Sequence, residues 1–150
     1  MAYNIVLVEP EIPTNTGNIG RLSLASGSNL HLVKPFGFEL SDSRLKRAGL
    51  DYWKHISVHI YDSIDEFYAV HNDKNMVYLS SHAEKDYCDI PYEDDLFFVF
   101  GKESTGLSKT ITEKYPDQLY KIPIYSDKVR SLNLANAVSI VVYEGLRNIR

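Results

Sequence analysis

The chain of 150 residues has little of what defines several common protein classes. Cys88 is its only cysteine, so no disulfide can form within the chain, and a cytoplasmic, reducing location is expected. No apolar run approaches the roughly 20 residues that a membrane-spanning helix needs, so we expect no membrane partner. The first residues show neither the basic region nor the apolar run of a signal peptide, and we expect none.

An excess of positive charge is also missing, since 16 Lys and Arg stand against 20 Asp and Glu and the net charge is −4. This balance argues mildly against a nucleic-acid partner. The charges are unevenly distributed, however. Acidic residues concentrate in segment 84–95, whereas Arg44, Lys46, Arg47 and Lys54 are close together in the sequence. A local basic surface is therefore compatible with the net acidic chain.

Short apolar, β-branched segments alternate with helical patterns along the whole sequence. Strands are predicted at 3–9, 30–33, 56–60, 75–80, 96–100 and 119–124. Helices are predicted within 14–28, after an opening loop, and at 41–50, 63–71, 108–115 and from 132 onward. The alternation predicts an α/β fold, with a mostly parallel sheet flanked by helices, in a single domain over residues 1–150.

The predicted last helix, from residue 132, is apolar almost all round, with only a thin seam of polar residues. A helix of this kind must be covered on every side. One sheet covers one side only. The other side is either plain core under more of the chain or the contact face of a second copy.

Ligands of an open parallel sheet collect in the loops after the carboxyl ends of its strands. Four such segments are rich in Gly, Asn, Ser or charge: 15–21, 79–82, 101–107 and 125–133. Segment 101–108 has two glycines of a phosphate-binding loop, but Leu107 stands where that motif needs lysine, which excludes a nucleoside triphosphatase. The GxxG pattern from Gly17 to Gly20 is weak evidence of RNA binding by itself. The five histidines have no metal-ligand spacing, so no metal is expected.

Simpler interpretations of the same residues stay open. Gly101 and Gly106 are explained equally well as turn residues. Arg21 and Glu103 fit solvated surface charges. Ser131 fits a helix N-cap, with Asn133 in the first turn.

Three motifs nevertheless occur together in a fixed order. They are Asn15 to Arg21, Phe100 to Leu107, and Ile122-Pro123 followed by Ser131 to Val138 and then Tyr143-Glu144. Together they resemble the three motifs of the SPOUT RNA methyltransferases, the trefoil-knotted class. Segments 9–13 and 47–52 narrow the resemblance, over the whole chain, to the small family members that methylate the ribose 2′-hydroxyl of a wobble cytidine or uridine in tRNA. Ala135 departs from the serine that relatives often have.

The resemblance implies S-adenosyl-L-methionine as cofactor, a homodimer, a C-terminal deep trefoil knot and the tRNA anticodon loop as substrate, with leucine tRNAs expected. It implies no metal. The implied catalytic residues are Arg21 and Asn133. The implied cofactor-binding residues are Leu79, Gly101, Glu103, Ile122 and Ser131.

A guanidinium is effectively always protonated, so we favour Arg21 as an electrostatic clamp on the 2′-oxygen or an adjoining phosphate rather than as a base. Tyr52 or Trp53 is expected to stack on splayed bases. The basic surface is predicted from six cations: Arg44, Lys46, Arg47, Lys54, Lys128 and Arg130. The alternatives are methylation of another RNA ribose, a non-catalytic RNA-binding protein of the same fold, and a small-molecule α/β enzyme.

Overall fold

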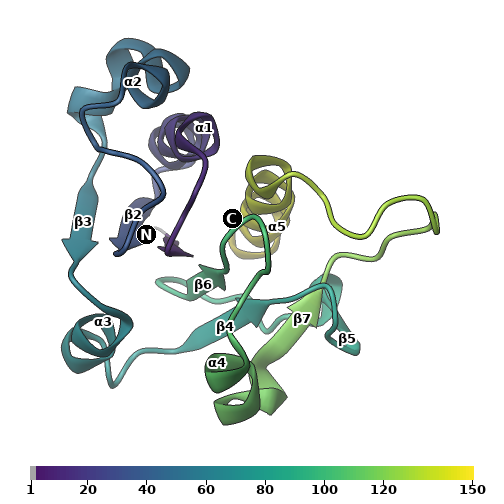
Figure 1. Cartoon of the computed structure of the whole chain (residues 1–150). Coiled ribbons are helices and arrows are strands. Elements are labelled where there is room, and N and C mark those ends of the chain that lie inside the picture. Colours follow the sequence, from purple (N-terminus) through teal and green to yellow (C-terminus); the bar gives the residue numbers. More distant parts are fainter. Residues whose placement is uncertain (1–2) are drawn as a thin grey trace.

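Seven parallel strands form one sheet, and helices cover both of its faces (Figure 1). The structure, a computed structural model, describes residues 3–150, apart from the side chains of residues 49–51. The strand order is β3-β2-β1-β6-β4-β7-β5, and each neighbouring pair runs parallel. The predicted α/β class with a parallel sheet is confirmed.

The described elements largely follow the predicted order. The strands are β1 (Asn4–Val8), β2 (Asn29–Val33), β3 (Val58–Tyr61), β4 (Met76–Leu79), β5 (Lys85–Asp86), β6 (Phe97–Phe100) and β7 (Leu119–Lys121). The α-helices are α1 (Pro13–Ala25), α2 (Ser43–Gly49), α3 (Ile64–Val70), α4 (Lys109–Lys114) and α5 (Leu134–Ile149). Three short 3-10 helices are η1 (Leu50–His55), η2 (Tyr87–Asp89) and η3 (Pro116–Gln118).

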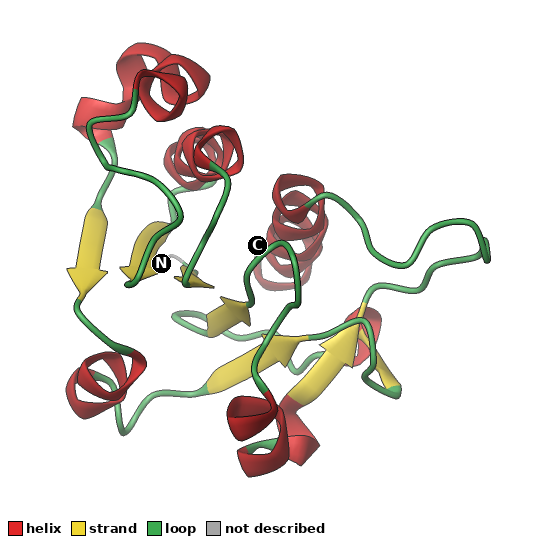
Figure 2. Cartoon of the chain, in the orientation of Figure 1, coloured by secondary structure: helices red, strands yellow, loops and turns green. Residues whose placement is uncertain are grey.

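The sheet separates two hydrophobic cores because successive strand side chains point to opposite faces. In β6, Phe98 and Phe100 belong to the core under α1 and α5, whereas Phe97 and Val99 belong to the core that α3 and α4 cover. Figure 2 shows the two groups of helices on either side of the strands. The connections at the carboxyl edge of the sheet are left free to form a site.

Helix α5 packs against β1 through its buried face, which includes Val138, Val142 and Gly145. The hydroxyl of Tyr3 donates to the carbonyl oxygen of Gly145 over 2.8 Å, and a Cβ at position 145 would lie 2.7 Å from the Tyr3 ring. Burial raises the pKa of Tyr3 to about 12. On the same helix, Ile140 and Tyr143 are 36% and 48% exposed. The sheet thus covers one side of α5 and leaves apolar side chains on another.

Two predicted boundaries are wrong, and one strand was not predicted. Helix α1 begins at Pro13, so residues 15–21 are helical and do not form the expected loop. Strand β7 ends at Lys121 rather than at residue 124, and segment 125–133 is exposed throughout. Strand β5 was not predicted, since it has two residues within the acidic segment and pairs only with β7.

A buried histidine on the α3 side of the sheet has a defined tautomer. Asn4 donates its amide to Asp95, so its Oδ1 accepts from Nε2 of His31 over 3.0 Å. Nδ1 of His31 must then accept from the hydroxyl of Tyr61 over 2.8 Å, and that oxygen accepts from Nε2 of His71, also over 2.8 Å. Burial, chiefly, lowers the pKa of His31 to about 3, and it also lowers the pKa of His71.

We predict that the free energy of unfolding decreases as the pH falls from 6.5, the pKa of His31 in the unfolded chain, toward its lower pKa in the folded chain. The unfolded chain protonates His31 near pH 6.5, whereas the folded chain does so only near pH 3. The stabilisation that neutral His31 gives the folded state is therefore complete above pH 6.5. Below that pH it is lost by at most about 1.4 kcal/mol per pH unit. Urea unfolding between pH 7.5 and 4.5 measures the slope. His31→Gln should flatten it and His55→Gln, at an exposed position, should not; an unchanged slope in His31→Gln would contradict this assignment.

Candidate functional site

Three of the predicted cofactor residues lie at the carboxyl ends of three adjacent strands. Leu79 is the last residue of β4 and pairs with Phe100 of β6 and Tyr120 of β7. Gly101 and Ile122 directly follow β6 and β7. Because the three strands are neighbours and parallel, these residues meet at one edge of the sheet, where Leu79 and Ile122 are half-buried and Gly101 is buried.

Gly101 is required by the close approach of its own loop. A Cβ at this position would lie 2.1 Å from the carbonyl carbon of Gly106 and 2.2 Å from the nitrogen of Leu107. The loop is closed by the Gly106 N–H, which donates to the Lys102 oxygen over 2.8 Å, and Gly106 has φ +72°. The turn interpretation of both glycines therefore describes their geometry, and any side chain at 101 would open the loop.

Glu103 is no solvated loop carboxylate, because it binds the start of α1. Its Oε1 accepts from the Glu11 N–H over 2.8 Å, and its Oε2 accepts from the Ile12 N–H over 3.1 Å. In return, Oε1 of Glu11 accepts from the Ser104 N–H over 2.8 Å, which holds the pKa of Glu11 below its usual value. The N-cap residue Ile12 has no capping side chain, so Glu103 supplies the negative charge that a helix N-terminus favours.

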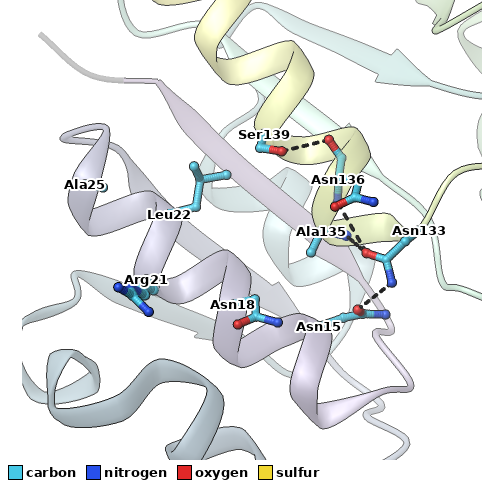
Figure 3. Close-up of a pocket in the computed structure, with 9 residues that line it drawn as sticks. All are labelled: Asn15, Asn18, Arg21, Leu22, Ala25, Asn133, Ala135, Asn136 and Ser139. Carbon is cyan, nitrogen blue, oxygen red and sulfur yellow. Dashed lines mark hydrogen bonds between the residues drawn. The ribbon is translucent and has the colours of Figure 1, made fainter.

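Two asparagines extend this contact to α5. Asn15, which is buried, donates its amide to Oε2 of Glu103 over 3.2 Å and accepts from Nδ2 of Asn133 over 3.1 Å. Oδ1 of Asn133 caps α5 by accepting from the N–H groups of Ala135 and Asn136 over 2.9 and 3.3 Å (Figure 3). A single hydrogen-bonded chain thus joins the three sequence motifs.

The interpretation of Ser131 as the helix N-cap is wrong. Asn133 is the N-cap and α5 begins at Leu134, so Ser131 lies outside the helix and is exposed. The amides of Ala135 and Asn136 are donated to Asn133 and are not the free ligand donors expected at this terminus. Ser131 therefore belongs to the exposed segment 125–133 that connects β7 to α5 (Figure 1).

Arg21 lies at a groove of about 590 Å³ between α1 and α5. The groove is lined by Asn15, Asn18, Arg21, Leu22, Ala25, Asn133, Ala135, Asn136 and Ser139. Figure 3 shows Arg21 on the side of α1 turned away from α5, and its Cζ lies 5.1 Å from the ring centroid of Tyr52. The lining includes both predicted catalytic residues, Arg21 and Asn133, but the Arg21 side chain points away from the helix that Asn133 caps. The lining includes neither the three residues at the sheet edge nor Ser131.

Sequence reasoning did not select three polar residues of this groove. Asn18 and Asn136 stand within the first and third motifs, and Ser139 follows Asn136 by one turn. Positions 136 and 139, and positions 15 and 18, share helix faces, so the spacing of polar residues on two apolar helices was the available signal.

The predicted basic residues divide into two groups. Arg44, Lys46, Arg47 and Lys54 are exposed on α2 and η1, the elements that pack beside α1, while Lys128 and Arg130 lie in segment 125–133. The guanidinium of Arg44 is paired with Asp42 at 3.0 Å. Trp53 is half-buried against Gly20, and Tyr52 is the more exposed of the two rings expected to stack on bases.

Within residues 3–150, apart from the undescribed side chains at 49–51, no group of three or more His, Cys, Asp or Glu is arranged to hold a metal ion. None of the helices in this described part is both long and apolar enough to cross a membrane.

Comparison with protein families and known proteins agrees with this arrangement. The model of the SpoU rRNA Methylase family matches residues 2–143. A tRNA (cytidine(34)-2'-O)-methyltransferase from Escherichia coli K12 is 42% identical over 147 residues, which cover 97% of this chain and 93% of that protein. A relative from Geobacillus stearothermophilus is 42% identical over 150 residues, 98% of this chain and 95% of that protein.

Solved structures are similar over the same length. A structure described as giving insight into 2-OH methylation of C/U34 on tRNA has a TM-score of 0.93 and 38% identity, covering 97% of this chain and 95% of that one. An AdoMet-bound rRNA methyltransferase from Sinorhizobium meliloti has a TM-score of 0.87 at 24% identity, over 98% of this chain and 56% of that one, and shares the fold.

We predict that Glu103→Ala lowers the free energy of unfolding by about 1–3 kcal/mol, because the N–H groups of Glu11 and Ile12 and the Asn15 amide lose their acceptor. Glu103→Gln should lose less, since one oxygen remains. Urea unfolding measures both. Glu113→Ala, at an exposed site on α4, is the control and should change little. Equal stability of Glu103→Ala and the control would show that this contact contributes nothing.

Proposed function

The chain belongs to the SpoU rRNA methylase family, and we propose that it transfers a methyl group to the ribose 2′-hydroxyl of the wobble nucleotide, a cytidine or modified uridine, in the tRNA anticodon loop. The observation that carries this proposal is the hydrogen-bonded chain from Glu103 through Asn15 to Asn133, which joins all three motifs, two of which line the α1–α5 groove. The relatives named for this activity, which match over nearly their full length, support the same substrate. Leucine tRNAs stay an expectation from the family resemblance alone.

S-adenosyl-L-methionine is the proposed cofactor, and the sheet edge fits it. Leu79 and Ile122 provide half-buried apolar surface for an adenine, and the backbone at Gly101 provides donors and acceptors beside them. Ser131 and Glu103 belong to the two connections that border this edge. When bound, the cofactor supplies a methyl carbon activated by the sulfonium charge. The chain's own task is to align the 2′-oxygen with that carbon, and alignment alone supplies about 7–11 kcal/mol in favourable cases.

Arg21 is proposed to stabilise negative charge on the 2′-oxygen or the adjoining phosphate. Its guanidinium stays protonated and is exposed at the groove, so its N–H groups can donate to an RNA oxygen. The proton of the hydroxyl leaves to phosphate or water. Asn133 is proposed to act beside Arg21 in the groove while its amide stays bound to Asn15.

A homodimer is proposed to cover the open side of α5. Ile140 and Tyr143 of α5 and Leu24 of α1 are exposed large apolar side chains on the two helices that border the groove. A second copy docked on these helices would remove them from water and place both Arg21 side chains near the interface. The C-terminal knot stays a prediction from the family resemblance, and the cytoplasmic location stays a prediction from the single cysteine.

The proposed activity is tested with labelled S-adenosyl-L-methionine and total tRNA from a strain lacking this modification, followed by mapping of the labelled nucleotide. Label at nucleotide 34 is expected. Arg21→Ala should lower turnover by about 100-fold or more, as expected for loss of a donor to developing charge. Lys109→Ala on α4 is the control. Label at another nucleotide would contradict the proposed methylation site. Binding of tRNA without methyl transfer would favour a non-catalytic RNA-binding protein. Wild-type turnover of Arg21→Lys would show that the guanidinium itself is dispensable.

The proposed interface is tested by sedimentation velocity. Ile140→Asp should convert the dimer to a monomer with an unchanged circular dichroism spectrum, because the side chain is exposed within one chain. Val70→Asp, at a 58% exposed site of α3 on the opposite face of the sheet, should remain dimeric. A wild-type monomer at micromolar concentration, or a dimeric Ile140→Asp variant, would remove this interface.

A further inference from the structure

Helix η1 is seated directly on the backbone of α1. Trp53 and Ile56 approach Gly20 so closely that a Cβ there would lie 2.8 Å from the Trp53 ring and 2.9 Å from the Ile56 side chain. Only a residue without a side chain allows this contact. This contact fixes the position of η1 relative to α1. Close to it, η1 carries the exposed Tyr52 and α1 carries the exposed Arg21.

Tyr52 and Arg21 are in contact across this junction. The Cζ atom of Arg21 lies 5.1 Å from the ring centroid of Tyr52, within the range of a cation–π interaction. Both side chains are exposed, and Tyr52 is 40% exposed. A free arginine on a helix surface samples many rotamers, whereas a guanidinium stacked on a ring is held in a few of them.

We propose that Tyr52 is a positioning residue, whose ring holds the Arg21 guanidinium at the edge of the α1–α5 groove. This inference rests on the proposed function, in which Arg21 meets the ribose oxygen. It also changes the role expected of Tyr52. One face of the ring is already used by the guanidinium, so Tyr52 acts on the reaction through Arg21 rather than as a platform for a base.

The kinetic test compares Tyr52→Phe, which keeps the ring, with Tyr52→Leu, which removes it. Tyr52→Leu should lower kcat by roughly three- to tenfold, as loss of an exposed cation–π contact allows, with KM for tRNA and for S-adenosyl-L-methionine unchanged. Tyr52→Phe should retain kcat. Lys114→Ala removes a similar contact, to the rings of Tyr68 and Tyr115 on the other face of the sheet, and should have no effect.

Two kinetic outcomes would overturn the proposal. A higher KM and weaker tRNA binding in Tyr52→Leu at constant kcat would mean that the ring binds RNA itself. An equal loss of kcat in Tyr52→Phe would assign the effect to the hydroxyl.

A second measurement needs no methyl transfer. In the free protein, the side-chain protons of Arg21 should show ring-current NMR shifts that persist in Tyr52→Phe and disappear in Tyr52→Leu. If the protein methylates no RNA, these shifts still report the contact while the proposed function fails. Their absence from a wild-type protein that methylates tRNA would overturn the positioning role alone.

Discussion

The carboxylate of Glu103 is the contact on which the arrangement of the site depends. It neutralises the start of α1, a helix without a capping side chain of its own, and through Asn15 it holds the residue that caps α5. Without this carboxylate, the N–H groups of Glu11 and Ile12 at the start of α1 would lose their side-chain acceptor. Because Glu103 follows Gly101 by two residues, the same loop also fixes the end of β6. One side chain thus determines the relative positions of two helices and the sheet edge.

This arrangement separates two tasks within one chain. The sheet edge at Leu79, Gly101 and Ile122 is partly buried and apolar, which suits a nucleoside. The α1–α5 groove is lined by four asparagines and Ser139 together with Leu22 and two alanines, and Arg21 lies at its side, where it can meet a sugar-phosphate oxygen. The chain of asparagines runs between them.

Local sequence predicted most of the fold because the strands are dense in β-branched and aromatic residues and α3 and α4 carry their own caps, Ser63 and Ser108. It failed at α1, where the cap comes from Glu103, 91 residues along the chain from Ile12. The sequence named candidate site residues and the loops that carry them, but not the hydrogen bonds that connect those loops. Ser131 and Asn133 are both suitable N-cap residues, so the local sequence does not decide that Asn133 is the cap. Trp53 is more buried than Tyr52 because it packs in the space above Gly20, which lies on another helix.

The contact between Tyr3 and Gly145 has a consequence for biosynthesis. It joins residues 142 positions apart, and the same face of β1 shares one hydrophobic core with Val138, Val141 and Val142 of α5. During translation, the earliest strand therefore waits for residue 145 to leave the ribosome before its hydrophobic surface is sealed. Contacts of such long sequence separation slow folding and lengthen the time for which nascent chains expose apolar surface. Nascent chains of this protein are accordingly expected to be clients of ribosome-associated chaperones until α5 emerges.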